Sequence, residues 1–317
     1  MTAERFFITG ALGCLGAWIV RNLVAEGAGV TVFDLGADRH RLEQVMRPDD
    51  IAQVTFVQGD ITQPEVVAQT VQAAGATHLI HLAALQVPAC KANPDLGARV
   101  NVVGTVNLFE AARQAGLKQV TYASSVAVYG PKANYPQALI PHDAPLLPQN
   151  LYGVYKQANE SAAKIYWQDE GLASIGLRPY IIYGPGRDQG LTSAPTKAMQ
   201  SAVAGQPFHI PYGGTSGYQF VDDVAKIFIQ AARTPFAGAD VFNIKGAVVP
   251  VSEVVAAIEQ AEPKAKGQIT FDDKPLPFPD GQDDAALASL LGHIPDTPLV
   301  DGVAFTIEHF RKMPVNL

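Results

Sequence analysis

The stretch Gly10-Ala-Leu-Gly13-Cys-Leu-Gly16 decides the fold of this chain, because it joins two segments of different periodicity. Before it, Arg5-Phe-Phe-Ile-Thr9 is typical of a buried strand, and after it residues 15–26 have the pattern of an amphipathic helix. A glycine-rich turn from strand to helix lets a phosphate approach the backbone and the free N–H groups of the helix N-terminus. The stretch therefore predicts a dinucleotide site, although its GxxGxxG spacing differs by one residue from the usual GxGxxG.

The alternation of strand and helix patterns continues through the first half of the chain. Short β-branched or aromatic runs predict further strands at residues 30–33, 54–57, 78–82, 120–123 and 175–178. Amphipathic runs predict helices at residues 64–74 and 96–115. Because strands that alternate with helices form βαβ units, we expect an α/β fold with a doubly wound, parallel Rossmann sheet.

The second half of the chain has a weaker pattern, which suggests a separate lobe. We assign residues 1–178 to the dinucleotide-binding domain, with residues 219–245 returning to its core. Within that return, residues 220–224 and 241–244 are expected to be short pieces of the core. Residues 179–218 and 246–317 are expected to form a smaller C-terminal α/β lobe that binds substrate at the carboxyl edge of the sheet.

The composition restricts the partners and the compartment. The 317 residues are 48% hydrophobic and 17% charged, with a net charge of −7, which argues against a nucleic-acid partner. Only two cysteines, Cys14 and Cys90, are present, so a reducing compartment is expected. No apolar run is long enough to span a bilayer, and residues 1–5 do not resemble a secretory signal. We therefore expect a cytoplasmic protein without a membrane partner.

An acidic residue after the second strand indicates which dinucleotide is bound. Asp34 follows the glycine stretch by about twenty residues, where a carboxylate accepts hydrogen bonds from ribose hydroxyls and repels a 2′-phosphate. NAD is therefore favoured, while Arg39 and Arg41 leave NADP open. Asp60, after the third strand, is placed to meet the adenine amino group, or else to cap the following turn near Thr62.

A second motif, Tyr152-Gly-Val-Tyr-Lys156, indicates proton transfer. On a helix, Tyr152 and Lys156 share one face. A neighbouring ammonium and a positively charged nicotinamide ring both favour the phenolate, which needs a pKa shift of about 3 units, or about 4 kcal/mol. Tyr152 would then act as general base, and Ser125 would hold the substrate hydroxyl in line. Tyr155 lacks a lysine four residues later, because that position is Asn159.

These motifs together resemble the extended short-chain dehydrogenases/reductases of the NAD-dependent epimerase/dehydratase family. Further matches in family order are Gly59-Asp60, His81-Leu-Ala-Ala84, Asn101-Val-Val-Gly-Thr105, Leu177-Arg178, Tyr183-Gly-Pro185 and Phe220-Val-Asp-Asp223. The resemblance implies Ser125, Tyr152 and Lys156 as the catalytic residues. It also implies a homodimer that pairs through helices at residues 96–115 and 152–170, in a four-helix interface.

The loop and the resemblance together give a set of expected contacts with NAD. These residues are Gly10, Gly13, Cys14, Leu15, Gly16, Asp34, Asp60, Ile61, Leu82, Ala83, Ala84, Asn101, Tyr152, Lys156, Tyr180 and Ile182. No metal site is expected.

Three departures from the family pattern restrict the reactions and substrates that we expect. Dehydratases of this family carry Asp-Glu after the catalytic Ser or Thr, whereas Val126 and Ala127 stand here and cannot exchange protons. Sugar-nucleotide epimerases present an Asn and an Arg to the diphosphate, at positions that are Ile181 and Ser216 here. Charge-assisted phosphate contacts are therefore missing, and a smaller substrate is expected.

The expected activity is NAD-dependent oxidoreduction, with hydride transfer at a hydroxyl-bearing carbon of a small sugar, sugar acid or polyol. An NAD-dependent sugar or nucleotide-sugar epimerase without net redox change is the alternative. Candidate substrate residues are Gln86, Ser124, Ser125, Arg187 and Tyr218. Arg187 would capture a carboxylate or hydroxyls, or else pair with Asp188. His81 and His142 are expected to pack or to lie in solvent rather than to react.

Overall fold

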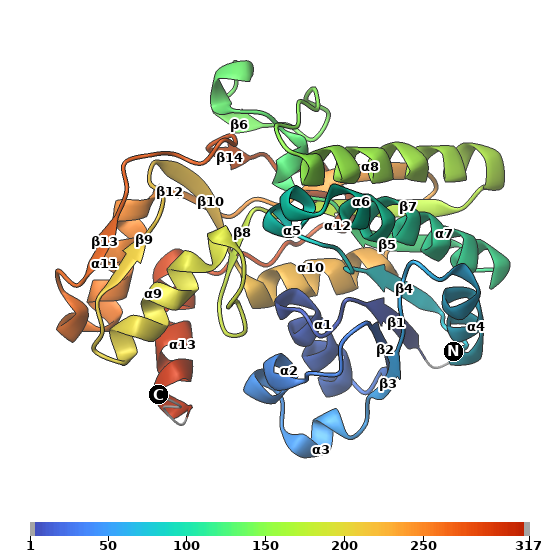
Figure 1. The fold of residues 1–317 in the computed structure, drawn as a ribbon, viewed down its shortest axis with the longest axis horizontal. Helices are drawn as coiled ribbons and strands as arrows, with labels where there is room; N and C mark the ends of the chain where they lie inside the picture. The colour runs from blue at the N-terminus through green and yellow to red at the C-terminus, as the bar shows by residue number, and fades with distance from the viewer. Residues whose placement is uncertain (1–3, 314–317) are drawn as a thin grey trace.

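A seven-stranded parallel sheet forms the centre of the larger part of the computed structural model, which describes residues 4–313 (Figure 1). The strand order is β11-β7-β5-β4-β1-β2-β3. The chain runs outward from β1 to β3 and then returns to β4 on the other side of β1, so the topology reverses between β1 and β4. The doubly wound Rossmann sheet predicted from the sequence is confirmed. Its strands are β1 (Arg5–Thr9), β2 (Gly29–Asp34), β3 (Thr55–Gln58), β4 (His78–His81), β5 (Gln119–Ala123), β7 (Ala173–Arg178) and β11 (Ala239–Asn243).

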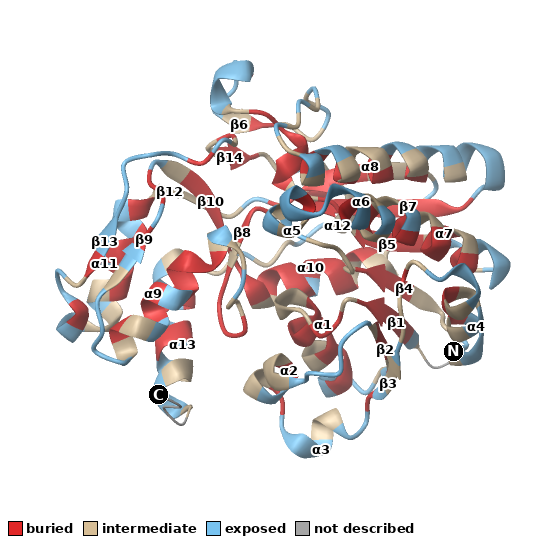
Figure 2. Ribbon diagram, in the orientation of Figure 1, coloured by how far each residue is buried: buried red, intermediate tan, exposed pale blue. Residues whose placement is uncertain are grey.

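Helices cover both faces of this sheet, which explains the apolar character of β1. Phe6 and Ile8 pack into one core cluster, and Phe7 packs into the other. On the first face lie α1 (Cys14–Ala25) and α10 (Val221–Arg233), and on the second lie α4 (Pro64–Ala74), α7 (Gly104–Gln114) and α8 (Leu151–Glu170). Each fully buried aliphatic or aromatic side chain contributes about 1.5–3 kcal/mol to the two clusters, and Figure 2 shows the buried residues concentrated there.

Two predicted elements differ from the structure. The helix expected at residues 96–115 is divided into α6 (Pro94–Ala98), a π-helical segment η1 (Arg99–Val103) and α7. Residues 220–224 are not a short core piece, because Phe220 ends strand β10 and Val221 begins the long helix α10. The carboxylates of Asp222 and Asp223 lie in the first turn of α10, where the helix dipole favours negative charge.

Within the described residues, the smaller part contains short strands and three α-helices. Strands β8 (Ile181–Tyr183), β10 (Thr215–Phe220) and β12 (Ala247–Pro250) form one sheet, and β9 (Phe208–Ile210) pairs with β13 (Ile269–Phe271). The helices are α9 (Ala194–Val203), α11 (Val251–Ala261) and α13 (Leu299–Lys312), whereas α12 (Ala285–Leu291) packs on β11 of the large sheet. Helix α10 packs on the large sheet, and β11 is one of its strands. The chain therefore returns to the core of the larger part with these two elements. The domain division given above remains a prediction.

The long segment after β5 is held by the C-terminal region. It contains η2 (Val126–Val128), η3 (Lys132–Asn134) and β6 (Leu139–Ile140), and β6 pairs with β14 (Gly281–Gln282). The remaining short elements are α2 (His40–Val45), α3 (Pro48–Ile51), α5 (Val87–Ala92), η4 (Leu191–Ser193) and η5 (Pro263–Ala265). Within residues 4–313, no helix has both the length and the apolar character needed to cross a membrane.

Candidate active site

A cavity of about 1190 Å³ lies where the strand order reverses, between the carboxyl edge of the large sheet and the smaller part. The glycine-rich loop, the segments after β2, β4 and β5, the start of α8 and the loop after β8 all contribute to its wall. The segment Leu276–Phe278 of the smaller part also lines it. Ligands of doubly wound sheets bind at such a reversal point.

The glycine-rich loop fits a diphosphate. Gly10 has a φ of 68°, and a Cβ there would lie 2.5 Å from the backbone nitrogen of Ala83, so only glycine is tolerated. Gly13 caps the N-terminus of α1 without any side-chain cap, which leaves helix N–H groups free. A Cβ at Gly13 would meet only the carbonyl oxygen of Gly10, at 3.2 Å, so protein packing alone does not demand glycine there. The loop therefore presents bare backbone to the cavity, as a phosphate group requires.

Two carboxylates lie beyond this loop along the cavity wall. Asp34 ends β2, and its Oδ2 and Oδ1 accept hydrogen bonds from the backbone N–H groups of Leu12 and Gly36, at 3.0 and 3.3 Å. Asp60 accepts a hydrogen bond from the N–H of Thr62 at 2.9 Å and still lines the cavity, so both roles considered for it are compatible. Each carboxylate keeps further acceptor capacity for ribose or adenine donors.

The two arginines that left NADP open are engaged elsewhere. The guanidinium of Arg39 lies over the Phe56 ring, 3.6 Å from its centroid. Arg41 donates from Nε and Nη2 to Oδ1 of Asp188, at 3.1 and 2.8 Å, and from Nη1 to the carbonyl of Leu12. His40 Nε2 lies 3.0 Å from the other Asp188 oxygen. We refer to His40, Arg41 and Asp188 as the clasp, since it ties α2 to the loop after β8.

The start of α8 fixes the predicted general base. Asn150 caps the helix by accepting a hydrogen bond from the N–H of Gly153 at 2.9 Å. A Cβ at Gly153 would lie 2.0 Å from the carbonyl oxygen of Ala127, so the helix approaches η2 as closely as glycine allows. Tyr152 and Ser125, which flank this contact, both line the cavity.

Lys156 lies behind Tyr152 rather than in the cavity wall. It is 2% exposed, and its Nζ donates to the carbonyl of Ala123 at 2.6 Å. The same Nζ lies 5.7 Å from the centroid of the Tyr152 ring. The predicted pair therefore shares one face of α8, with the lysine anchored to the end of β5.

The pKa of Tyr152 departs from the expectation. Burial raises it to about 12, and the Ser125 hydroxyl and the Arg187 charge, which act in the opposite direction, do not offset that effect. Burial also lowers the pKa of Lys156 to about 8. The expected lowering of this pKa relied on two cations, the Lys156 ammonium and the nicotinamide ring, and the protein groups alone leave the pKa high because desolvation dominates. A positively charged ring beside Tyr152 would supply the missing stabilisation.

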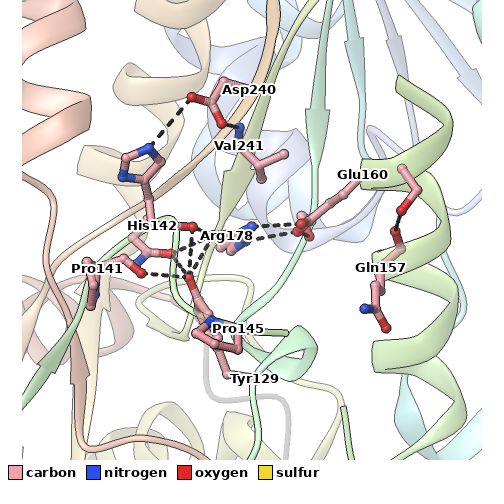
Figure 3. Close-up of polar contacts among 12 residues, drawn as sticks. Tyr129, Pro141, His142, Pro145, Gln157, Glu160, Arg178, Asp240 and Val241 are labelled. Atoms are coloured by element: carbon pink, nitrogen blue, oxygen red, sulfur yellow. Dashed lines mark hydrogen bonds and ion pairs between the residues drawn. The ribbon is translucent and has the colours of Figure 1, made fainter. Parts of the chain in front are cut away.

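A buried network behind the site involves a residue that the sequence analysis missed. Glu160 lies one turn after Lys156 on α8, and Arg178 at the end of β7 donates to both of its oxygens, at 2.9 and 2.7 Å (Figure 3). Their side chains are only 3% and 4% exposed. Arg178 also donates to the Tyr129 hydroxyl and to the His142 carbonyl, at 2.6 Å each. The network therefore joins α8, β7 and the long segment after β5.

Ser124 belongs to this network as well. It lines the cavity, but its hydroxyl forms a short hydrogen bond with Glu160. The substrate contact predicted for Ser124 stays a prediction, in which the hydroxyl that donates to Glu160 would accept a hydrogen bond from the substrate. Glu160 could have been suspected from its spacing, since it is the next residue after Lys156 on the same helical face.

Most predicted residues line the cavity, and three do not. Those in its wall are Gly10, Gly13, Cys14, Leu15, Gly16, Asp34, Asp60, Ile61, Leu82, Ala83, Ala84, Gln86, Ser124, Ser125, Tyr152, Tyr180, Ile182 and Arg187. Asn101, Lys156 and Tyr218 are buried outside it. Asn101 instead exchanges hydrogen bonds with both backbone groups of Leu85, at 2.7 and 2.9 Å, and so supports the loop that follows β4.

The two histidines do not lie in the cavity wall. His81 is buried between the hydroxyls of Thr9 and Thr105, and burial lowers its pKa to about 3, so it remains neutral. His142 stacks on Phe242 and lies 3.6 Å from Asp240. Among residues 4–313, no group of three or more His, Cys, Asp or Glu side chains is placed to hold a metal ion.

The cavity wall also contains residues that sequence reasoning did not select, among them Lys91, Gln149 and Leu276–Phe278. Their positions depend on long-range packing, which no local pattern reports. Ile181 and Ser216, the two positions that depart from the epimerase pattern, are fully buried and do not line the cavity.

A dinucleotide cradle facing a Ser, Tyr and Lys set defines the class as a nicotinamide-dependent enzyme of the short-chain dehydrogenase/reductase type. Residues 6–244 match the family model of the NAD dependent epimerase/dehydratase family. The chain belongs to this family, and its cofactor is NAD.

Individual relatives agree with this assignment. The chain is 31% identical to a UDP-glucose 4-epimerase of Mycolicibacterium smegmatis, over 97% of this chain and 99% of the relative. It is 29% identical to UDP-glucuronate 4-epimerase 4 of Arabidopsis thaliana, over 93% of this chain and 72% of the relative. The structure of a Thermus thermophilus UDP-glucose 4-epimerase in complex with NAD superimposes with a TM-score of 0.82 at 27% identity, covering 98% of this chain and 99% of that one.

Proposed function

We propose that this enzyme oxidises or reduces a hydroxyl-bearing carbon of a small, unactivated sugar, sugar acid or polyol. The observation that carries this proposal is the burial of Ile181 and Ser216 outside the cavity. Neither position offers the cavity an amide or a guanidinium for a diphosphate. The binding energy lost in this way is large, because charge-assisted hydrogen bonds are stronger than hydrogen bonds between neutral groups. A substrate without a nucleotide anchor is free to leave after oxidation.

The proposed roles follow from the geometry. In the oxidation direction, the substrate C–H bond breaks with its electron pair, the O–H proton passes to the Tyr152 phenolate, and a C=O bond forms. NAD supplies the hydride acceptor when bound. Ser125 holds the reacting oxygen, while Lys156, anchored to Ala123, contributes positive charge behind the Tyr152 ring.

The test is NAD reduction, followed by absorbance, across free sugars, aldonates, uronates and polyols, with UDP-sugars and NADP in parallel. Reduction with an unactivated compound is the expected result. If only a UDP-sugar reacts, and it is isomerised without accumulation of reduced cofactor, the oxidoreductase proposal is wrong.

A second candidate is a sugar epimerase that retains NAD and shows no net redox change. Two observations favour it: the whole-length similarity to a UDP-glucose 4-epimerase, and the clasp, in which Arg41 and Asp188 pair in the cavity wall beside the glycine-rich loop. An enzyme that regenerates its cofactor in each turnover gains from holding it tightly. NAD that survives purification and gel filtration would favour this candidate.

We also propose a homodimer in the cytoplasm. Large apolar side chains are exposed along α6, η1 and α8, where the family resemblance implies a four-helix interface: Leu96, Val103, Val154, Ile165 and Trp167. Burial of such a stripe against a second copy would remove it from water. Cys14 and Cys90 are both free, as a reducing compartment requires. Light scattering after gel filtration tests the dimer.

A further inference from the structure

Arg187 is a cation in the cavity wall that no carboxylate of the described residues neutralises. It lies in the loop after β8, and its Nη2 donates to the Thr192 hydroxyl at 2.9 Å. Its Nε is buried and has no hydrogen-bond partner within residues 4–313. The adjacent carboxylate, Asp188, would be the obvious partner, but it is bound to Arg41 and His40 instead. A guanidinium that lines the cavity without a counter-charge favours an anionic ligand there.

Arg187 shares the cavity with the groups expected to react, because Arg187, Ser125 and Tyr152 all line its wall. Burial raises the pKa of Tyr152 to about 12, and the Arg187 charge acts in the opposite direction. An anion held by Arg187 therefore lies in the same cavity as the hydroxyls of Tyr152 and Ser125.

A second polar side chain converges on the same point. A Cβ built on Gly190, which has a φ of 86°, would lie 2.3 Å from Oε1 of Gln86 and 3.8 Å from Nη2 of Arg187. Gln86 comes from the N-terminus of α5 and Arg187 from the smaller part, so the two approach each other from separate elements. The amide N–H₂ of Gln86 adds donors for an oxygen-rich ligand.

We propose that Arg187 binds a carboxylate of the substrate, so that the substrate is a hydroxy acid of the sugar-acid class. This inference rests on the proposed function and narrows it. A guanidinium holds a carboxylate through two parallel N–H···O bonds, which fixes the plane of the acid and thereby the orientation of the neighbouring carbinol carbon. The exposed cation Lys91, also in the cavity wall, increases the local positive charge of a protein whose net charge is −7.

The test compares acids with their neutral counterparts on the NAD-saturated enzyme. Calorimetry in a Tyr152→Phe background, where turnover cannot interfere, measures binding of D-glucuronate against D-glucose and of UDP-glucuronate against UDP-glucose. The expected result is about 100-fold tighter binding of the acid of at least one pair, a ratio that falls to near one in Arg187→Gln and recovers in part in Arg187→Lys. Arg47→Gln, which removes an exposed arginine at the N-cap of α3, is the matched control and should leave the ratio unchanged.

The two pairs identify the source of the carboxylate and separate this inference from the proposed function. Preference for free D-glucuronate supports a small sugar acid, whereas preference shown only by UDP-glucuronate keeps the carboxylate contact but moves the substrate to a nucleotide sugar and overturns the small-substrate proposal. Equal weakening of both UDP-sugars in Arg187→Gln, without any preference for acids, means that Arg187 holds the diphosphate. That result overturns the inference, as does an acid preference that survives the substitution. Retained NAD affinity in each variant shows that the protein is folded.

Discussion

Arg41 and Asp188 form an ion pair that connects the two sides of the cofactor cavity, with Nε and Nη2 of the arginine 3.1 and 2.8 Å from the same carboxylate oxygen. Arg41 also binds the carbonyl of Leu12 in the glycine-rich loop, while Asp188 belongs to the loop after β8. A hydrogen bond from Trp18 Nε1 to the Pro185 carbonyl, at 2.9 Å, adds to the same connection. Because these residues come from both sides of the cavity, we predict that this connection opens when NAD exchanges.

The clasp should therefore control cofactor exchange. Asp188→Asn removes the charge that holds Arg41 and His40, and we expect NAD to dissociate about 10-fold faster, as loss of one charge-assisted contact allows. Stopped-flow release of NAD measures this rate. Asp50→Asn, which breaks the exposed Arg47–Asp50 pair on α3, is the control and should not change it. An unchanged rate in Asp188→Asn would show that the clasp does not restrict exchange.

The retention of NAD should also depend on pH through His40. Its hydrogen bonds with Asp188 and Asp38 raise its pKa above the ordinary value, despite burial and the Arg41 charge, which lower it. The protonated form strengthens the clasp, so this contribution is complete below pH ~6.5 and is lost as the pH rises through the raised pKa. We expect faster NAD release with rising pH in that window, and a flat profile in His40→Asn. A profile that keeps its slope in His40→Asn would assign the titration to another group.

Tyr152 and Tyr155 offer a matched pair for testing the general base. Tyr152 lines the cavity, whereas the Tyr155 hydroxyl donates to the Pro94 carbonyl at 2.9 Å, away from it. Tyr152→Phe should lower kcat by about 10²–10⁴-fold with NAD affinity retained, because only proton transfer is lost. Tyr155→Phe should keep kcat within a few-fold. Steady-state kinetics and NAD titration measure both, and comparable kcat values in the two variants would contradict the assignment.

The sequence predicted those parts of the fold that depend on local patterns of apolar and glycine residues. The strand, glycine turn and helix from Arg5 to Ala25 follow from periodicity and from three glycines, and the family motifs then give the sheet. Residues 220–224 were misjudged because a short apolar run before Asp-Asp fits a strand end and a helix start equally well, and only packing of α10 against α1 selects the helix.

The contacts that complete the site join residues far apart in the chain. Arg41 and Asp188 are 147 positions apart, so no local window could report their pairing. The pairing decides the electrostatics around Arg187, because the carboxylate next to Arg187 in sequence is bound to another arginine. The effect of burial on the Tyr152 pKa could not be predicted from the motif for a related reason, since the extent of burial is a property of the folded wall.

The Glu160–Arg178 pair should stabilise the packing of the catalytic helix α8. Glu160→Gln leaves the Arg178 guanidinium buried without its counter-charge, and we expect a loss of about 3–5 kcal/mol in the free energy of unfolding. Chemical denaturation measures this loss. In the double variant Glu160→Gln/Arg178→Met, part of the stability should return, because the uncompensated charge is then absent.

The activity of the double variant shows whether the Glu160–Arg178 pair positions the catalytic residues or only stabilises the fold. Since Arg178 also holds the Tyr129 hydroxyl and the His142 carbonyl, its removal frees the segment after β5 that carries Ser125. We expect kcat to stay low after stability has recovered, with KM for NAD little changed, because the displaced groups act on the reacting hydroxyl rather than on the cofactor. If kcat returns together with stability, the pair serves folding alone and does not position Ser125 and Tyr152.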